Sequence, residues 1–380
     1  MGVRVRRQHL GNLLLLVVST VVAVGIAEVL FRWHTSRTFD RDLPEWAGNL
    51  VVVRGAQVFA FKPHVSGDFV GSVDMKRTFP YRTNAHGLRD RDRPPKAPGT
   101  KRVLVVGDSY TWGYAIAEEE AFPQVAERLF AARGRRDVEV INGGMPDYNS
   151  RQERALLATL VPIYQPDAVV LAYVVNDAEP TTSMPTAPEE VYRHSRSWFL
   201  TELAEQLNRR LFRRRLLPSA KHNVASNYLD GFEDGSVKWR DSREAIGEMR
   251  DLAAAAGSSF TVLMMPDFTQ PLDDQYGLRK IHDAVARWGR ELNIPVFDLL
   301  ELFRGEDHST LIVPWDGHPN AEAHRRIAAF LVDKGLEDPN LSPSVRAVSV
   351  AGFNGSSGGT SAPAAPRPDP RPAAARASAR

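Results

Sequence analysis

The chain has 380 residues, 43% hydrophobic and 25% charged, a composition typical of globular proteins that excludes wholesale disorder, collagen and coiled coils. It contains no cysteine, so disulfides, thiolate metal sites, iron–sulfur clusters and thiol nucleophiles are excluded. The formal net charge is +2, but the first seven residues contribute +3 and the last 38 contribute +4, so the chain between them carries −5, which argues against nucleic-acid binding there.

An apolar stretch near the start of the chain runs from Leu10 to Phe31, follows a basic flank, and contains Glu28 as its only charged residue. At 1.5 Å per residue this stretch is long enough to cross the hydrocarbon core of a membrane. We therefore predict a cytoplasmic flank and transmembrane anchor over residues 1–34, with the rest of the chain in the periplasm or outside the cell. The small residues Gly25-Ile26-Ala27 leave a cleaved signal peptide open as the alternative.

Two further segments flank the part of the chain with regular patterns. Residues 35–100 form a lead-in segment with a few β-like pieces, and their sequence predicts no particular fold. Residues 338–380 are poor in large apolar side chains, which could not offset the entropy lost on ordering them. We predict a disordered tail there.

Between residues 101 and 337, apolar runs of strand length alternate with helical patterns. The predicted strands cover 102–106, 138–141, 167–175, 259–265 and 295–299, and the predicted helices cover 118–132, 150–163, 241–256, 277–292 and 320–332. Continuous apolar runs separated by helices indicate an α/β fold with a parallel sheet of about five strands. Residues 178–240 interrupt the alternation, and we predict an insertion over the sheet.

The block Gly107-Asp108-Ser109 directly follows the first predicted strand of this region. Ligands of open parallel sheets bind beyond the carboxyl ends of the strands, so the Ser109 hydroxyl is predicted to face that crevice. A serine in this position is also a common helix cap, which is the alternative. A phosphate-binding loop is disfavoured, because neither Gly-Lys-Ser/Thr nor G-x-G-x-x-G occurs here.

A serine hydroxyl becomes a good nucleophile only when a base takes its proton. Among ten histidines, His318 lies in a compact cluster with Asp316, after the last predicted strand and before the last helix. That position is on the same rim as Ser109, and Asp316 could orient the imidazole. The alternative is a loop that only caps the helix.

We predict that Asp307-His308 is a surface loop. The remaining histidines considered are predicted to be structural or exposed: His64, His86, His222, His282 and His324.

Two more loops follow strands at this rim, where hydrogen-bond donors could stabilise an oxyanion. The loop from Asn142 to Tyr148 follows the second predicted strand, and Asn176 follows the third. The Asn176 amide can donate to developing negative charge without titrating, although asparagine is also common in turns. Serine, glycine-rich loop, asparagine and Asp-x-His thus occur in order at four successive rim positions.

These four blocks resemble the SGNH (GDSL-type) hydrolase superfamily over about residues 100 to 337. The lead-in from Arg82 to Asp90 also resembles the segment that precedes the serine block in membrane-anchored bacterial members. The resemblance implies a three-layer flavodoxin-like fold. It also implies hydrolysis or transfer of an ester-linked acyl group without a metal or cofactor.

The resemblance further implies a role for each matching residue. Ser109 would be the nucleophile, His318 the general base and Asp316 its orienting acid. The oxyanion donors would be the Ser109 N–H, a backbone N–H of the second-block loop, and the Asn176 side chain. The loop donor is Asp147, which replaces the usual glycine, or Gly144 in a shifted register.

Two other departures concern the third and fourth blocks. Val174 occupies the position of the usual third-block glycine. The last block has Asp-x-His, with Asp316 two residues before His318, where many members have Asp-x-x-His. Some exopolysaccharide-acetylating relatives share the shorter spacing, which keeps a transferase open.

We therefore expect a membrane-tethered serine esterase whose substrate is an acyl ester, with a glycan or a lipid as the candidate carrier of the acyl group. One alternative is an O-acyltransferase that acts on cell-envelope or secreted polysaccharide. The other is a non-catalytic binding or assembly module that keeps the fold.

Overall fold

A computed structural model describes residues 2–42, 49–53, 57, 59–70, 78–180, 196–200, 203–204, 228–233, 235–313 and 316–338. The predicted insertion at 178–240 therefore lies partly outside the described residues. The predicted tail at 338–380 lies outside them except for Asp338.

A five-stranded parallel sheet forms the core of the fold. Its strands are β5 (Lys101–Gly107), β6 (Val138–Gly144), β7 (Ala168–Tyr173), β8 (Ser259–Met264) and β9 (Val296–Asp298), in the order β6-β5-β7-β8-β9. Gly107 pairs with Gly144 on one side and with Ala172 on the other, so the carboxyl ends of the three strands are level. The strand order reverses between β5 and β7, and open α/β sheets bind ligands at such a switch point.

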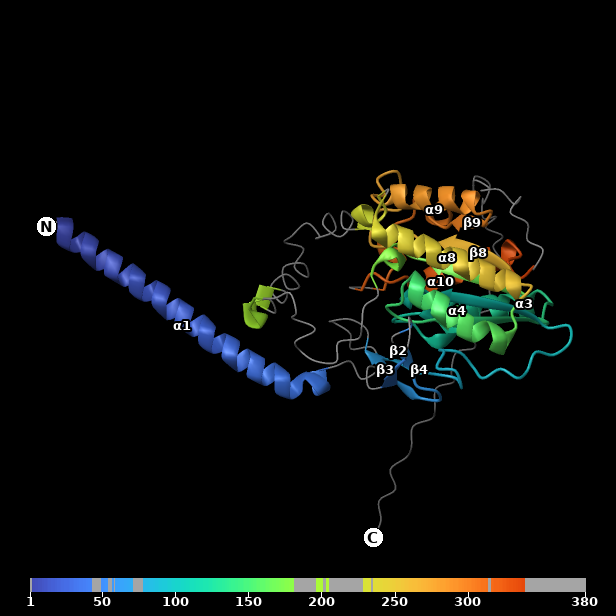
Figure 1. Cartoon of the computed structure of the whole chain (residues 1–380), viewed down its shortest axis with the longest axis horizontal. Helices are drawn as coiled ribbons and strands as arrows, with labels where there is room; N and C mark the ends of the chain where they lie inside the picture. The colour runs from blue at the N-terminus through green and yellow to red at the C-terminus, as the bar shows by residue number, and fades with distance from the viewer. Residues whose placement is uncertain are drawn as a thin grey trace, which may run out of the picture. The chain divides into compact units, whose positions relative to one another are not determined.

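Five helices cover the two faces of the sheet (Figure 1). They are α3 (Phe122–Ala132), α4 (Ser150–Tyr164), α8 (Val237–Ala255), α9 (Arg279–Glu291) and α10 (Ala321–Asp333). On one face α4 packs against α8, and α9 lies beside α8, with the rings of Trp239 and Trp288 6.0 Å apart. On the other face α3 packs against α10. The sheet is thus the middle layer of three.

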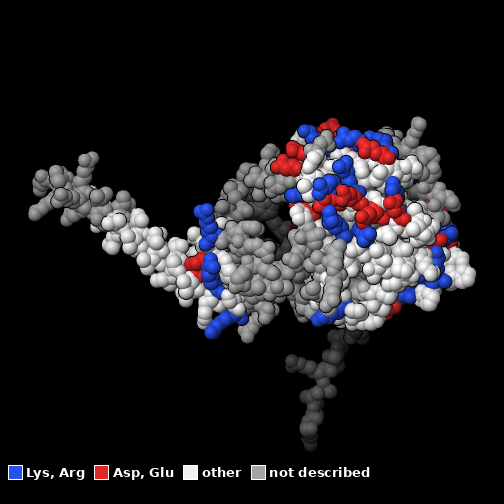
Figure 2. All heavy atoms as spheres, in the orientation of Figure 1, with Lys and Arg blue, Asp and Glu red and all other residues white. Residues whose placement is uncertain are grey.

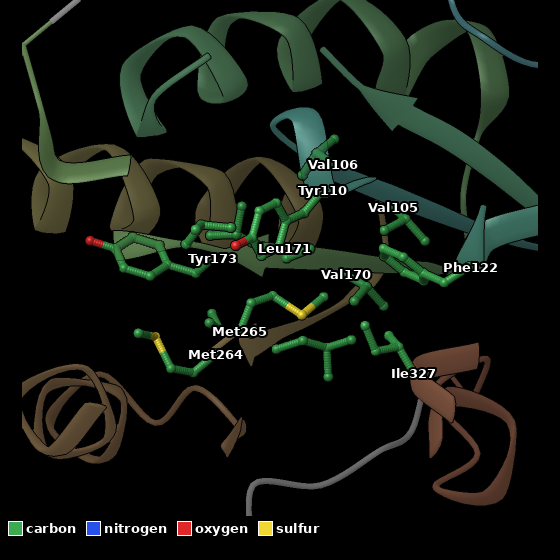
Figure 3. Packing of buried hydrophobic residues seen from close by; sticks show 14 of the residues in the cluster. Val105, Val106, Tyr110, Phe122, Val170, Leu171, Tyr173, Met264, Met265 and Ile327 are labelled. Atoms are coloured by element: carbon green, nitrogen blue, oxygen red, sulfur yellow. The ribbon is translucent and has the colours of Figure 1, made fainter. Parts of the chain in front are cut away.

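The interior of the sheet is apolar because both of its faces are covered. All six residues of β7 are buried, as are six of the seven residues of β5. Figure 3 shows Val105 and Val170 from these neighbouring strands, with Met264 of β8 and Ile327 of α10 close by. Continuous burial explains why these strands are recognisable as uninterrupted apolar runs.

The lead-in segment forms two antiparallel hairpins. β1 (Leu50–Val52) pairs with β2 (Phe59–Phe61), and β3 (Ser66–Val70) pairs with β4 (Thr78–Arg82). The Phe61 ring stacks on Trp112 with centroids 5.9 Å apart, and Phe59 meets Tyr148 edge-on at 5.2 Å. The lead-in therefore shares its hydrophobic core with the sheet.

Helix α1 (Gly2–Asp42) contains the apolar stretch, which is not buried inside the protein. Within the described residues it is the one helix long and apolar enough to cross a membrane, from Leu14 to Arg37. In Figure 2 the described part of this helix shows charged atoms only toward its C-terminal end. A membrane anchor and a signal sequence both meet this description.

The predicted fold class is confirmed, with small differences at the ends of elements. The predicted strand at 138–141 continues to Gly144, because its ladder with β5 runs on through the pairs Val105–Asn142, Val106–Gly143 and Gly107–Gly144. The helix predicted at 118–132 begins at Phe122, after a separate 3-10 turn, η2 (Glu118–Glu120). Helix α8 begins at Val237, four residues before the predicted start.

Candidate active site

Ser109 lies at the first position of the short helix α2 (Ser109–Trp112), which follows β5. Asp108 caps this helix, since one oxygen of its carboxylate accepts a hydrogen bond from the Tyr110 N–H at 2.9 Å. The other oxygen accepts from Asn176 Nδ2 at 3.0 Å. Ser109 is 9% exposed, so its hydroxyl is at the edge of the core rather than on an open surface.

His318 lies beside Ser109 although 209 positions separate them. Its Nε2 atom is 2.8 Å from Ser109 Oγ. On the other side of the ring, Nδ1 forms a hydrogen bond with Asp316 Oδ1. The Asp316 side chain is 6% exposed and the His318 side chain is 24% exposed. The structure thus joins the three predicted residues in one hydrogen-bonded chain.

The loop that carries His318 owes its shape to Gly317. This glycine has φ +96°, and a β-carbon there would lie 2.6 Å from Thr269 Cγ2. The loop is closed by a hydrogen bond from the Val313 N–H to the His318 carbonyl at 2.8 Å. Asn320 then caps α10. The turn that brings the Asp316 carboxylate to the His318 ring therefore requires glycine at position 317. Trp315, the neighbour of Asp316, lies outside the described residues.

Two tyrosines from the serine block contact the imidazole. The Tyr114 ring stacks on His318 with centroids 4.3 Å apart and an angle of 19°, and Tyr110 meets it edge-on at 5.4 Å. Burial raises the pKa of Tyr114, and the charges of Asp316 and Asp147 raise it further. The phenol is therefore neutral, and its ring restricts the orientation of His318. Sequence reasoning missed both contacts, because only the fold brings the two segments together.

Asn176 and Asp147 lie on the neighbouring loops. Asn176 is half-buried in the 3-10 turn η3 (Val175–Ala178), and its bond to Asp108 uses one of its two amide hydrogens. Asp147 is exposed with φ +62°, an uncommon backbone conformation for a residue with a side chain. Although the residue as a whole is exposed, neighbouring atoms displace part of the water around its carboxyl, which raises the pKa of Asp147, and the attraction of His318 opposes this rise.

Gly144 has different surroundings. Its N–H donates to Asn142 Oδ1 at 2.9 Å, and a β-carbon there would lie 2.2 Å from the Trp112 backbone nitrogen. A glycine is therefore required by the close approach of β6 and α2. Because the Gly144 N–H is already used, these contacts favour Asp147 for the loop donor. Val174, the other departure from the family pattern, is buried, and its N–H donates to Asp177.

Of the histidines predicted to be structural or exposed, His282 and His324 are buried, His64 and His86 are exposed, and His222 lies outside the described residues. His282 is buried between Asp298, 2.7 Å from its Nδ1, and the Tyr276 hydroxyl, 3.1 Å from its Nε2. His324 Nδ1 accepts from the Phe122 N–H, and burial lowers the pKa of His324 to about 3. In the Asp307-His308 pair, the exposed Asp307 accepts from the Ser309 N–H and caps the 3-10 turn η5 (His308–Thr310).

Arg89 of the lead-in segment stabilises the C-terminal end of α2. It is fully buried, and its guanidinium donates to the carbonyls of Trp112, Gly113 and Ile116 at 3.1, 2.5 and 2.8 Å. Burial lowers the pKa of Arg89 to about 10, opposed by the charges of Glu118, Glu119 and Glu120. The cation thus satisfies carbonyls at the C-terminal end of the helix that carries Ser109. Apart from the family resemblance of the lead-in, no sequence signal indicates this role.

Three buried carboxyl groups lie beneath the site, on Asp108, Glu153 and Asp177. Neither carboxyl oxygen of Glu153 has a hydrogen-bond partner among the described residues. Burial raises the pKa of Glu153, and the charge of Asp108 raises it further. Burial and the nearby charge thus favour the neutral, protonated form of Glu153. Within the described part of the chain, no group of three or more acidic or histidine side chains is arranged to hold a metal ion.

Replacing Glu153 with glutamine is expected to stabilise the fold relative to the wild type at high pH, by about 1.4 kcal/mol for each pH unit above about 4.5 over which the folded state keeps the Glu153 proton, because an amide has no such proton to lose. Below about pH 4.5 the glutamic acid is protonated in both states. As the pH rises, the unfolded chain loses this proton first, so the wild type loses stability up to the raised pKa, and the variant avoids that loss. Urea unfolding of the full chain in detergent at about pH 5 and about pH 8 measures the difference.

The matched control is Glu244→Gln, because the Glu244 side chain on the same face of the fold is 62% exposed. This variant should follow the wild type at both pH values. An identical pH dependence for Glu153→Gln and the wild type would show that Glu153 is ionised in the folded state.

Comparison with known proteins identifies the family. The model of the GDSL-like lipase/acylhydrolase family matches residues 105–326, more than half of the chain. No curated protein matches the chain in sequence.

The solved structures to which the chain is similar include a lipase/acylhydrolase and two esterases. A lipase/acylhydrolase from Enterococcus faecalis is 17% identical, with 62% of this chain and 96% of that one covered and a TM-score of 0.40. The esterase EstA from a Pseudoalteromonas species is 14% identical, with coverage of 61% and 95% and a TM-score of 0.38. An acetyl xylan esterase is 14% identical, with coverage of 61% and 98% and a TM-score of 0.39.

The family match includes the nucleophile block and His318, and it agrees with the five-stranded sheet. The chain belongs to the GDSL-like lipase/acylhydrolase family, and it is an SGNH serine hydrolase.

Proposed function

We propose that the protein is an esterase that cleaves an ester-linked acyl group with Ser109, His318 and Asp316 as its catalytic triad. The observation that supports this proposal most directly is the hydrogen-bonded chain from Ser109 Oγ through His318 to Asp316. A serine, a base in contact with it, and a third group that orients the base are the parts that nucleophilic catalysis requires.

In the first half of the reaction, Ser109 Oγ attacks the ester carbonyl while His318 Nε2 takes its proton. Asp316 holds the Nδ1–H and stabilises the imidazolium that forms. The tetrahedral oxyanion accepts hydrogen bonds from the Ser109 N–H, the free amide hydrogen of Asn176, and the Asp147 N–H. When the intermediate collapses, the alcohol leaves with the proton from His318, and the acyl group stays on Ser109.

In the second half, water gives up a proton to His318 Nε2 and attacks the acyl-enzyme. Collapse of this second intermediate releases the acid and returns the proton to Ser109 Oγ. A sugar hydroxyl in place of water would make the same protein an O-acyltransferase. The short Asp-x-His spacing, which some exopolysaccharide-acetylating relatives share, is the observation that favours this second function. A glycan or a lipid remains our proposed carrier of the acyl group.

The chain organisation is also part of the proposal. We propose that residues 1–34 are the cytoplasmic flank and anchor in the cell membrane, and that residues 101–337 are the catalytic domain, outside the cytoplasm. The apolar helix α1 with its basic flank supports this orientation.

A fluorophosphonate probe tests the proposal, because it phosphonylates only serines activated by a neighbouring base. We expect the full chain in detergent to be labelled once, on Ser109, as located by mass spectrometry. The folded protein would remain unlabelled if it were a non-catalytic module. With an activated acyl ester and candidate glycans, the ratio of acylated sugar to free acid then separates the transferase from the esterase.

A further inference from the structure

Glu28 is an acidic residue within the apolar part of α1, and its carboxylate has hydrogen-bond partners on another segment of the chain. Its carboxylate accepts hydrogen bonds from Ser197 Oγ at 2.7 Å and from the N–H groups of Trp198 and Phe199, each at 3.0 Å. Arg32, one turn further along α1, also donates to it. The Glu28 side chain is 17% exposed. A short segment from the predicted insertion thus supplies three of the donors.

Further contacts between α1 and this segment lie on the same side of the helix. The Phe31 ring meets the Phe199 ring edge-on, with centroids 6.2 Å apart. The guanidinium of Arg32 lies 4.7 Å from the centroid of the Trp198 ring. Residues 28, 31 and 32 are spaced by three and four positions, so they form one face of a helix. We call residues 197–200 together with Leu203 the docked segment.

The contact lies near one end of the apolar stretch. A hydrocarbon core of about 30 Å takes about 20 helical residues, so a span that starts between Leu10 and Leu14 ends between about residues 30 and 34. Glu28 and Arg32 then lie in the outer part of the core or at its boundary, with Glu28 within about 9 Å of the end of the span. An ionised side chain at this depth is costly unless it is hydrogen-bonded, which the docked segment provides. Tryptophan and arginine are typical of this boundary layer.

The docked segment also presents apolar side chains outward. Leu200 is 45% exposed and Leu203 is 50% exposed, whereas Trp198, which contacts Arg32, is 6% exposed. On α1 itself, the side chains of Val29 and Leu30 are 67% and 59% exposed. Exposed leucines beside a helix that crosses the membrane would lie at the level of the lipid headgroups and upper acyl chains.

We propose that the docked segment is a second membrane-contacting element, held on α1 by Glu28 and seated in the interfacial layer of a lipid bilayer. The proposal rests on the proposed function of α1 as a retained anchor. It gives the hydrolase two points of attachment to the membrane, one in its anchor and one within its catalytic region. Glu28 is a positioning residue in this arrangement, because it binds the docked segment and not the lipid.

Cross-linking tests the docking, and the absence of natural cysteines makes every introduced thiol unique. In the full chain in phosphatidylcholine vesicles, Phe31→Cys with Phe199→Cys should be joined rapidly by a short bismaleimide. The matched control is Val29→Cys with Phe199→Cys, since residue 29 lies about 200° around the helix from residue 31. Adding Glu28→Ala to the first pair should slow its cross-linking about tenfold, as expected for the loss of a hydrogen bond to a charged acceptor. Equal rates for the two pairs would overturn the docking.

Lipid contact needs a separate readout. A fluorophore on Leu200→Cys should be quenched by lipids that carry a nitroxide near the headgroup, whereas the same fluorophore on Val237→Cys should not. Val237 is 57% exposed on α8 and serves as the control for an exposed apolar position. Val21→Cys, 66% exposed on α1 and near the middle of the span, reports the anchor itself, with lipids that carry the nitroxide at the end of the acyl chain. Quenching at residue 21 without quenching at residue 200 overturns the second contact and leaves the anchor intact. The absence of quenching at residue 21 overturns the anchor.

Discussion

Replacing Ser109 with alanine is expected to lower kcat for a short acyl nitrophenyl ester by about 10⁶-fold, the loss seen when a serine hydrolase loses its nucleophile. The reason is local, because Ser109 Oγ is the hydroxyl that shares a hydrogen bond with His318 Nε2. With the hydroxyl removed, only water activated at the site and the oxyanion donors remain to promote hydrolysis. Release of nitrophenolate by the full chain in detergent measures the effect.

The matched control for this experiment is Ser309→Ala, since Ser309 is an exposed serine whose hydroxyl bonds to Asp307. Its kcat should equal that of the wild type. Thermal unfolding of the Ser109 variant checks that the fold is retained, because a small change at this position leaves the packing of β5 and α2 in place. Activity of Ser109→Ala within tenfold of the wild type would refute the proposed nucleophile.

Replacing Asp316 with asparagine is expected to lower kcat by about 10⁴-fold, as in other triads whose acid is neutralised. The carboxylate accepts from His318 Nδ1, which leaves Nε2 free to take the serine proton. An amide at this position can donate to Nδ1 instead, so the ring adopts the tautomer with hydrogen on Nε2 and cannot act as a base. Steady-state kinetics give kcat and KM, and the rate of phosphonate labelling should fall in parallel.

Asp307→Asn is the control for the second experiment, because this acid precedes a histidine at an exposed turn away from the hydrogen-bonded chain. It should leave kcat unchanged. A loss of less than tenfold in Asp316→Asn would mean that another group orients His318. The charge of Asp147 acts on this ring, so the double variant with Asp147→Asn would then identify the substitute.

The sequence predicts the sheet and the order of the site blocks because both depend on simple patterns. Strands buried on two faces leave continuous apolar runs, and the carboxyl ends of parallel strands meet at one edge. Ser109, Asn176 and His318 therefore follow strands in the sequence and come together in space. Gly317 and Asn320 mark the turn and the helix start beside His318, and they are local signals as well.

Other features depend on contacts that no local pattern records. Arg89 and Tyr114 are ordinary residues in the sequence, and their importance comes from what they touch in the folded protein. Glu153 lies on an amphipathic helix, where a glutamate normally faces water, yet it is fully buried. The hairpins of the lead-in have strands of only three to five residues, too short to show a clear alternation.

The buried guanidinium of Arg89 limits how much of the N-terminal part of the chain can be removed without destabilising the catalytic domain. The segment that the family model matches begins at residue 105. This is sixteen positions after Arg89, whose guanidinium donates hydrogen bonds to the carbonyls at the C-terminal end of α2. The unit that must fold together here is therefore longer than the segment that the family model matches. A transplant of the hydrolase into another scaffold would have to carry the upstream hairpins with it.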